Sequence, residues 1–198
     1  MNAVTTSLQA SKDTATAVGL DADALLSEIW RTLETLTDPE IPVVSLREMG
    51  ILRDVRGDVS RGFEVVITPT YSGCPAMEQI KDDVLAAMAN LGLQATVTTQ
   101  LAPAWTTDWM SKEAHEKLRA YGIAPPLACA STSSSAHTKE AQTHVLTFAK
   151  RRDAQQRIAC PQCAYDNTTE ISHFGSTACK ALYKCLACLE TFDYFKPY

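Results

Sequence analysis

Residues 63–92 read FEVVITPTYSGCPAMEQIKDDVLAAMANLG, which is an alternating apolar stretch, a polar loop and an amphipathic stretch in direct succession. Apolar residues alternate from Phe63 to Ile67, as in a half-buried strand. Pro75 suits the first turn of a helix, where its missing N–H group leaves no hydrogen bond unmade. The stretch therefore predicts a strand that leads into a helix, with Cys74 at the junction.

The sequence around this stretch supplies the other elements of one domain. Apolar residues recur at helical spacing after Asp21, and a short turn at 56–58 joins two strands into a hairpin. The expected elements are helices at 21–36, 75–91 and 107–121 and strands at 51–55, 63–67 and 93–101. Their order, α-β-β-α-β-α, is typical of an α+β fold built as a two-layer α/β sandwich, which we expect to span residues 21–126.

The segments on either side of this domain differ from it in composition. Residues 1–20 are rich in Ala, Thr and Ser without any periodicity, and they predict a disordered tail. Residues 127–157 contain a serine-rich run from Ser131 to Ser135 and predict a linker. The remaining residues, 158–198, are expected to form a second and smaller domain.

Four cysteines define this second domain. Their spacing, Cys160-x2-Cys163-x21-Cys185-x2-Cys188, places two thiols in each of two tight knuckles, and four thiolates make a tetrahedral metal site. A segment of this size buries too little apolar surface to fold alone, so a zinc ribbon with a structural zinc is expected. Four thiolates also suit iron, which is the alternative metal.

Other residues of the ribbon leave alternatives open. Strands are expected at 168–174 and 191–195, between and after the knuckles. Cys179 is a fifth candidate ligand, although a free cysteine also packs well as a small buried hydrophobe. Ala164 and Leu189 follow the second cysteine of each knuckle, where glycine is common because it accepts a positive φ. A differently shaped knuckle turn is therefore expected.

The charge distribution argues against several classes of protein. The formal net charge is −5. The acidic excess lies before residue 150, so nucleic acid, whose binding requires neutralised phosphates, is not an expected partner of that part. The short basic patch of Lys150, Arg151, Arg152 and Arg157 suits a solvated linker or, alternatively, a nucleic-acid-binding ribbon. No apolar run is long enough to span a membrane and no secretory signal is apparent, so a cytoplasmic protein is expected.

Cys74 is the candidate for chemistry outside the ribbon. The positive end of the following helix would favour its thiolate. Thr68 and Thr70 could line a polar pocket, and Asp38 and Glu40, held between prolines, could face the same point. The alternative is an ordinary buried cysteine at the start of a helix. No histidine or asparagine is placed as the partner of a protease-type nucleophile.

Three motifs carry a resemblance to a known family. They are Asp38-Pro39-Glu40-Ile41-Pro42, Met49-Gly50-Ile51-Leu52-Arg53-Asp54-Val55 and Thr68-Pro69-Thr70-Tyr71-Ser72-Gly73-Cys74-Pro75. In this order and spacing, over residues 23–102, they resemble the domain shared by iron–sulfur cluster assembly factors such as SufT. Residues 174–183 and 192–196 resemble one branch of that family, PaaD (also called PaaJ), a component of the phenylacetyl-CoA 1,2-epoxidase system of bacterial phenylacetate degradation.

The resemblance implies a role in this epoxidase system without catalysis by the chain itself. The chain has no pair of Glu-x-x-His motifs for a di-iron centre and no Gly-rich dinucleotide fingerprint. An accessory protein is therefore expected, one that matures the iron–sulfur or di-iron centre of another subunit, above all of the iron–sulfur reductase. The family's reactive cysteine corresponds to Cys74 and its acidic motif to Asp38 and Glu40, and a transient iron–sulfur cluster at this site is implied. The alternative is an integral structural subunit of the epoxidase.

Overall fold

The structure is a computed structural model that describes residues 22–127 and 157–198. The expected tail at 1–20 and most of the expected linker at 127–157 lie outside these residues. In chain order the elements are α1 (Ala22–Leu33), β1 (Thr37–Asp38), β2 (Ile41–Ser45), β3 (Leu52–Asp58), β4 (Gly62–Ile67), α2 (Met77–Asn90), β5 (Ala95–Thr99), η1 (Thr107–Trp109), α3 (Lys112–Tyr121), β6 (Ile123–Ala124), β7 (Thr168–Ser172), β8 (Lys180–Cys185) and β9 (Thr191–Phe195). Within the described part of the chain, no helix is long and apolar enough to cross a membrane.

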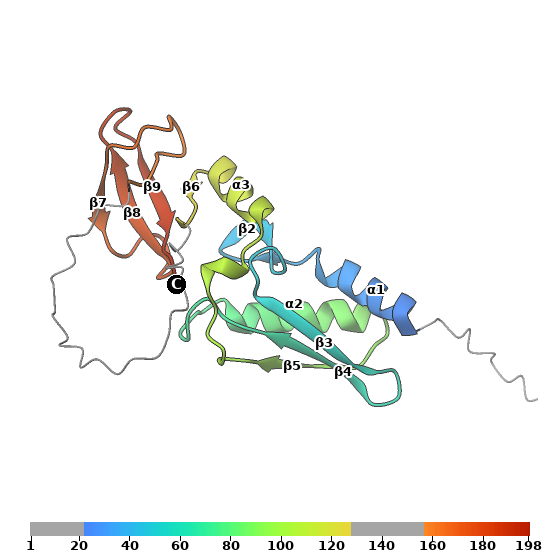
Figure 1. Cartoon of the computed structure of the whole chain (residues 1–198). Coiled ribbons are helices and arrows are strands. Elements are labelled where there is room, and N and C mark those ends of the chain that lie inside the picture. The colour runs from blue at the N-terminus through green and yellow to red at the C-terminus, as the bar shows by residue number, and fades with distance from the viewer. Residues whose placement is uncertain (1–21, 128–156) are drawn as a thin grey trace, which may run out of the picture.

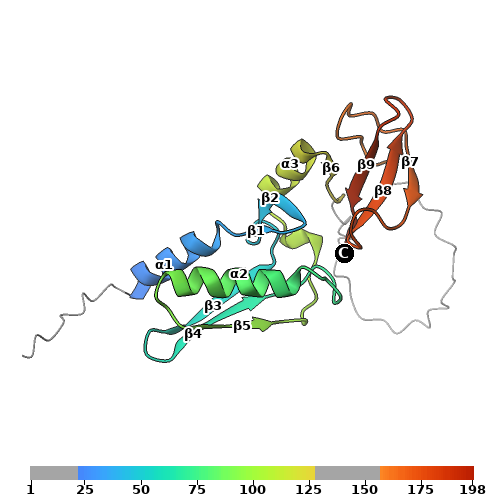
Figure 2. The ribbon, with the colours of Figure 1, turned by 180° about the vertical axis from the view of Figure 1, so that it is seen from behind.

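A three-stranded sheet, with α1 and α2 packed on one side of it, forms the larger unit (Figures 1 and 2). The strand order is β3-β4-β5. Strands β3 and β4 are antiparallel, whereas β4 and β5 are parallel because α2 connects them as a crossover helix. Leu33 of α1, Val84 and Met88 of α2, and Val65 and Ile67 of β4 are fully buried where the layers meet. The predicted two-layer α+β architecture is therefore confirmed.

The turn between β3 and β4 lies three residues later than predicted. Strand β3 continues through Asp58, whose side chain accepts two backbone N–H groups and so closes the turn at 59–61. Gly57 stays within the strand pair at φ +118°, where a Cβ atom would collide with the carbonyl oxygen of Gly62. The prediction of a turn at 56–58 is wrong because this glycine permits a close approach of the two strands and does not form the turn.

The helix predicted at 107–121 is divided in two. The 3-10 turn η1 covers Thr107–Trp109, and α3 begins only at Lys112. The division occurs because Ser111 is extended and its hydroxyl accepts the backbone N–H group of Ala114, which makes Ser111 the N-cap of α3.

The proline-rich segment after α1 forms a small hairpin, which is absent from the elements expected from the sequence. Asp38 Oδ1 accepts the backbone N–H groups of Glu40 at 2.7 Å and of Ile41 at 3.2 Å, which closes the turn between β1 and β2. Ile41 and Val44 are buried and anchor β2 in the core. The acidic motif therefore lies on a short turn whose position is set by the core.

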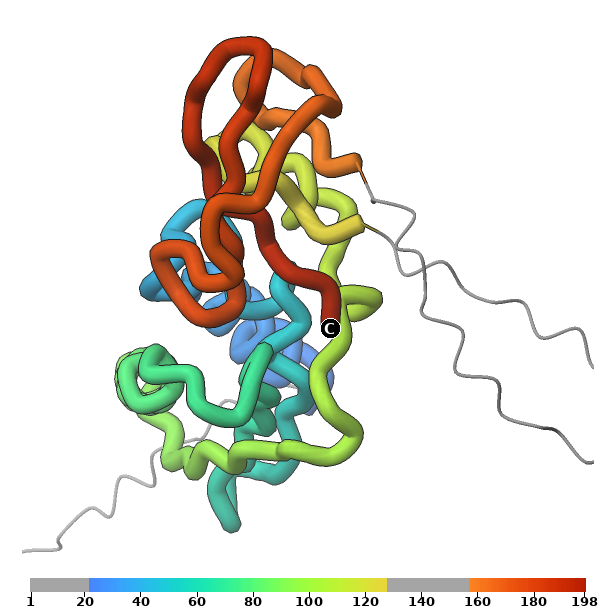
Figure 3. Tube along the Cα trace, turned by 90° about the vertical axis from the view of Figure 1, so that its left-hand side faces the viewer, coloured from blue at the N-terminus to red at the C-terminus, as the bar shows by residue number. Residues whose placement is uncertain are grey.

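The C-terminal residues form a four-stranded sheet that includes a strand from the larger unit. The strand order is β6-β9-β8-β7. Strand β6 directly follows α3 and runs parallel to β9, with Ile123 opposite Asp193 and Ala124 opposite Tyr194. Strands β7 and β9 match the predicted ones, whereas β6 and β8 were not predicted. Figure 3 shows the last residues, in red, running from the ribbon down beside the larger unit.

The end of β9 packs into the core of the larger unit. Phe195 is fully buried, and the centre of its ring lies 6.0 Å from that of Trp105. The Trp105 indole donates to the carbonyl oxygen of Met49 at 2.9 Å. The backbone N–H group of Thr107 donates to the carbonyl oxygen of Tyr198 at 3.2 Å. The division of the chain into two domains therefore stays a prediction. Residues of the ribbon, Cys179 and Phe195, are part of the apolar core of the larger unit.

Replacing Phe195 with alanine is expected to lower the free energy of unfolding by about 3–5 kcal/mol, because a fully buried ring leaves a cavity beside Trp105. Phe174 is 63% exposed and provides the matched control, for which we expect a change below about 1 kcal/mol. The measurement is chemical denaturation of the metal-loaded proteins. Equal effects of the two substitutions would show that Phe195 does not join the two parts of the chain.

Candidate functional site

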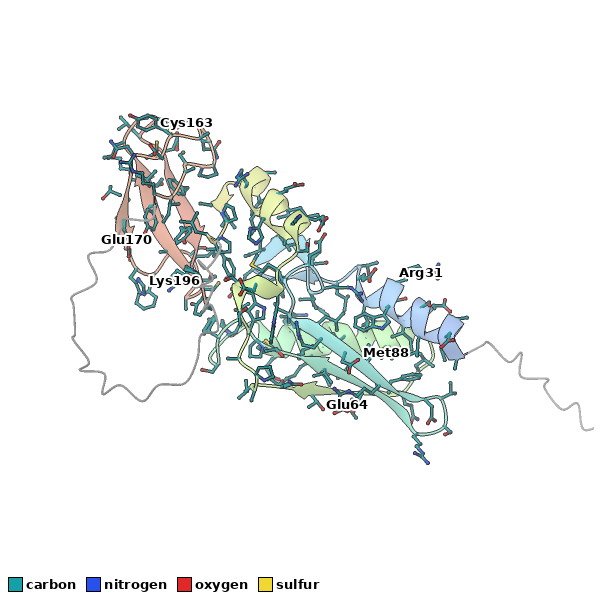
Figure 4. All side chains as sticks on the ribbon, in the orientation of Figure 1. Arg31, Glu64, Met88, Cys163, Glu170 and Lys196 are labelled. Carbon is teal, nitrogen blue, oxygen red and sulfur yellow. The ribbon has the colours of Figure 1, made fainter. Side chains whose placement is uncertain are left out.

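The four ribbon cysteines converge at the tip of the ribbon that points away from the larger unit, where Figure 4 shows Cys163. Cys160 Sγ lies 3.7 Å from Cys188 Sγ, and Cys163 Sγ lies 3.6 Å from Cys185 Sγ. All four sulfur atoms lie within 4.8 Å of one another. A tetrahedral zinc with Zn–S bonds of about 2.3 Å requires sulfur atoms about 3.8 Å apart. The four thiols therefore fit a closed, four-coordinate metal site.

Both knuckle turns adopt the backbone conformation that glycine usually supplies. Ala164 has φ 60° and Leu189 has φ 66°, both in the left-handed region. The N–H group of Ala164 donates to the carbonyl oxygen of Cys160 at 2.9 Å, and the N–H group of Ala187 reaches Cys185 Sγ at 3.4 Å. Both knuckle turns therefore keep the usual shape, and the expected change of shape is absent. The left-handed conformation costs about 1–2 kcal/mol at each of the two residues.

Cys179 lies at the other end of the ribbon from the four clustered sulfur atoms. Its carbonyl oxygen accepts the N–H group of Lys196 at 3.0 Å, and Figure 4 shows Lys196 at the end that faces the larger unit. Only 4% of Cys179 is exposed, and it belongs to the same apolar cluster as Phe195. The structure thus separates this cysteine from the four-cysteine site.

Cys74 is half-buried in the loop between β4 and α2. Its sulfur accepts the backbone N–H group of Ala76, the N-cap residue of α2. Burial outweighs this bond and, with the nearby Glu40, Asp38 and Cys179, raises the pKa of Cys74 to about 11. Burial of Cys74 therefore opposes the thiolate that the positive end of α2 favours.

The two carboxylates of the acidic motif lie within electrostatic range of Cys74. Burial raises the pKa of Asp38, although the N–H groups that its side chain accepts partly offset the effect. Burial and then the charge of Asp38 raise the pKa of Glu40. The structure therefore places both carboxylates where they act electrostatically on the Cys74 thiol.

Thr68 and Thr70 lie on the segment that leads from β4 to Cys74, and both are buried. The N–H group of Thr68 donates to the carbonyl oxygen of Ile51 at 2.8 Å. Among the described residues, Thr68 Oγ1 is the one buried side-chain oxygen or nitrogen without a hydrogen-bond partner. An unpaired buried hydroxyl costs about 1–3 kcal/mol, so this strand end carries an unmade hydrogen bond.

Sequence reasoning missed two ribbon residues, Thr177 and Lys180, that lie at the Cys74 site. The Thr177 hydroxyl lies 3.0 Å from Cys179 Sγ and is close enough to the Glu40 carboxylate to lower its pKa. Lys180 is only 3% exposed, and its ammonium group lies 3.8 Å from the Asp193 carboxylate. Its positive charge lowers the pKa of both Asp38 and Glu40. No local pattern relates residues so far apart in the chain. The one signal in the sequence was Cys179, a ribbon cysteine that does not fit the spacing of the four metal-site cysteines.

Two family descriptions match parts of the chain. Residues 26–99 match the iron–sulfur cluster assembly protein family, and residues 147–196 match the PaaD zinc beta ribbon domain. The Fe-S protein maturation auxiliary factor YitW of Bacillus subtilis (strain 168) is 33% identical over 94 residues, which are 46% of this chain and 91% of that protein. A crystal structure of a domain of unknown function from Bacillus anthracis covers 49% of this chain and 93% of its own, with 28% identity and a TM-score of 0.45.

A protein of Escherichia coli (strain K12) matches along most of its length. Its provisional name describes a subunit of 1,2-phenylacetyl-CoA epoxidase, and it is 45% identical over 170 residues, which are 85% of this chain and 91% of that protein. A match of this length includes both the larger unit and the ribbon. The chain therefore belongs to the PaaD family of 1,2-phenylacetyl-CoA epoxidase subunits.

Proposed function

We propose that this protein is an accessory subunit of a bacterial phenylacetyl-CoA 1,2-epoxidase system and assists the assembly of an iron–sulfur or di-iron centre in another subunit. The observation that carries the proposal is Cys74, held beside the carboxylates of Asp38 and Glu40. The names of two relatives support it, one for the epoxidase and one for Fe-S protein maturation. The partner that we propose as target is the iron–sulfur reductase of the system.

The Cys74 site has the chemistry of a place that receives metal-containing cargo. Carboxylates and thiols gathered in a partly buried position favour an added cation. A thiol must lose its proton before it binds iron, so binding of the cargo and release of the proton are coupled. Burial raises the pKa of Cys74 to about 11, which favours the protonated thiol in the empty site. A bound cation would favour loss of this proton.

The four-cysteine site holds a structural zinc in this proposal. Four thiolates leave no coordination position open for a substrate, and iron is the alternative ion for the same ligands. Free thiols of this kind need a reducing compartment, which suits the cytoplasm. The metal would act by fixing β8 and β9, and with them the residues from Thr177 to Lys180 beside Cys74.

Epoxidation itself is assigned to other subunits. A carboxylate-bridged di-iron centre draws Glu-x-x-His motifs from two helices. The single such sequence of this chain runs from Glu170 to His173 on and after strand β7, with His173 Nδ1 3.4 Å from Glu170 Oε1. The nucleic-acid alternative rests on a basic patch of which Lys150, Arg151 and Arg152 lie outside the described residues, whereas Arg157 forms an ion pair with Asp166 at 3.1 Å.

Deletion of the gene for this protein is expected to leave the reductase subunit at normal abundance but depleted of iron and acid-labile sulfide. The measurement is iron and sulfide analysis of reductase purified from deletion and complemented strains. A fully loaded reductase from the deletion strain would overturn the maturation role. If, in addition, purified epoxidase lost activity whenever this chain was omitted from the reconstituted complex, the chain would be a structural subunit.

A further inference from the structure

The ribbon brings a second thiol to the Cys74 site. Cys179 is part of the main apolar core, against which Cys74 also packs, and it is near enough to Cys74 to raise the pKa of that thiol. With 4% of its surface exposed, Cys179 is enclosed between the ribbon and the larger unit. The pairing of β6 with β9 and the buried ring of Phe195 hold the ribbon in this position.

A hydrogen-bonded residue links this second thiol to the acidic motif. The Thr177 hydroxyl lies 3.0 Å from Cys179 Sγ and is close enough to the Glu40 carboxylate to lower its pKa. The turn that carries Thr177 is closed by the N–H group of Lys180, which donates to the carbonyl oxygen of Thr177 at 3.1 Å. Thr177 therefore orients a thiol and a carboxylate from different parts of the chain towards one place.

The charges around this place are unbalanced. The acidic groups that act on one another there are Asp38, Glu40, Tyr71, Cys74, Cys179 and Tyr198. Burial raises the pKa of every one of them. The opposing cation is Lys180, whose ammonium group also lies 3.8 Å from Asp193. A partly buried set of sulfur and oxygen groups that shares the charge of Lys180 favours further positive charge.

We propose that Cys179 is the second thiolate ligand, together with Cys74, of the iron–sulfur cargo. This inference rests on the proposed function and adds a residue of the ribbon to the cargo site. It gives the ribbon a direct part in cargo binding, which its own closed four-cysteine site cannot provide.

Binding through these two residues forms two Fe–S bonds and breaks two S–H bonds. Two protons leave, and no electron is transferred. Among the described residues, the four ribbon cysteines are the one group of three or more Cys, His, Asp or Glu residues placed to hold a metal ion by themselves. Two thiolates at the Cys74 site would therefore supply only part of the coordination of the cargo.

The test uses the full-length protein with its ribbon metal bound, reconstituted anaerobically with Fe²⁺ and sulfide. Loss of a group that merely supports a metal ligand weakens metal binding by about 10–100-fold. Cys74→Ser and Cys179→Ser should therefore each weaken cluster binding by at least about 100-fold, measured by competition with an iron chelator. Thr177→Val keeps both thiols and should weaken cluster binding by only about 10–100-fold, as expected for a supporting residue. Cys129→Ser, which removes a cysteine outside the described residues, is the matched control and should bind as the parent does.

The pH dependence of cluster binding separates a ligand from a structural residue. Burial raises the pKa of both thiols, so each ligand should release one proton on binding, and apparent affinity should rise about 100-fold per pH unit near neutral pH. In Cys179→Ser the rise should be about tenfold per pH unit, because one releasable proton remains. The carboxylates, the phenols and Lys180 are the same in both proteins and cancel in this comparison.

The outcomes distinguish this inference from the function on which it rests. Parent affinity and an unchanged pH slope in a Cys179→Ser protein that keeps its ribbon metal would overturn the inference and leave the role of Cys74 intact. If Cys179→Ser lost the ribbon metal, the result for Thr177→Val would decide, and parent-like affinity there would count against the inference. A fully loaded reductase in the deletion strain would overturn the proposed function itself, whatever the binding measurements show.

Discussion

Replacing Cys185 with serine is expected to release the ribbon metal and to unfold residues 158–198. Cys185 is fully buried, and its sulfur lies 3.6 Å from that of Cys163. Metal binding contributes about 10–16 kcal/mol to the folding of small four-ligand modules. The ribbon's own apolar cluster contains few buried side chains, among them Ile158, Phe192 and Tyr194, so it cannot replace that contribution.

The measurement is metal content by mass spectrometry together with amide hydrogen exchange of the ribbon. Cys179→Ser is the matched control, because it removes a ribbon cysteine that lies outside the four-sulfur cluster. The control should keep one metal ion and a protected ribbon. A Cys185→Ser protein that kept its metal and its protected amides would contradict the four-thiolate site.

Replacing Cys74 with serine is expected to abolish growth on phenylacetate to the same extent as deletion of the gene. The substitution is nearly isosteric at a half-buried position, so the free energy of unfolding should change by no more than about 1 kcal/mol. A hydroxyl at this position cannot supply the soft thiolate ligand that iron–sulfur clusters select. Function should therefore be lost while the fold remains.

Growth rate and the iron content of the reductase are the two measurements for this variant. Ser72→Ala is the control, because Ser72 is exposed in the same loop and belongs to none of the proposed ligands. It should support normal growth. Full growth with Cys74→Ser would show that the thiol has no role, even if deletion of the whole gene stops growth.

The elements that could be predicted are those whose signal is local. The alternation from Phe63 to Ile67 and the apolar face of α2 each arise within one segment, because strand and helix side chains repeat with periods of 2 and 3.6 residues. The predictions of secondary structure were wrong where a hydrogen bond from a single side chain fixes the backbone conformation. Ser111 divides the last helix by capping α3, and Asp38 converts an extended segment into a hairpin by accepting two N–H groups. Such bonds leave no periodic trace in the sequence.

By itself the sequence determined the strand–loop–helix unit around Cys74, the α+β class and the spacing of the four metal-site cysteines, because each depends on residues close together in the chain or on a fixed ligand spacing. Only the tertiary structure decided the pKa of Cys74 and the place of Cys179. Both depend on burial and charge contributed by segments about 100 residues apart, which β6–β9 pairing and the packing of Phe195 on Trp105 bring together. Pairing and packing of this kind are properties of two surfaces, and no pattern within either segment specifies them.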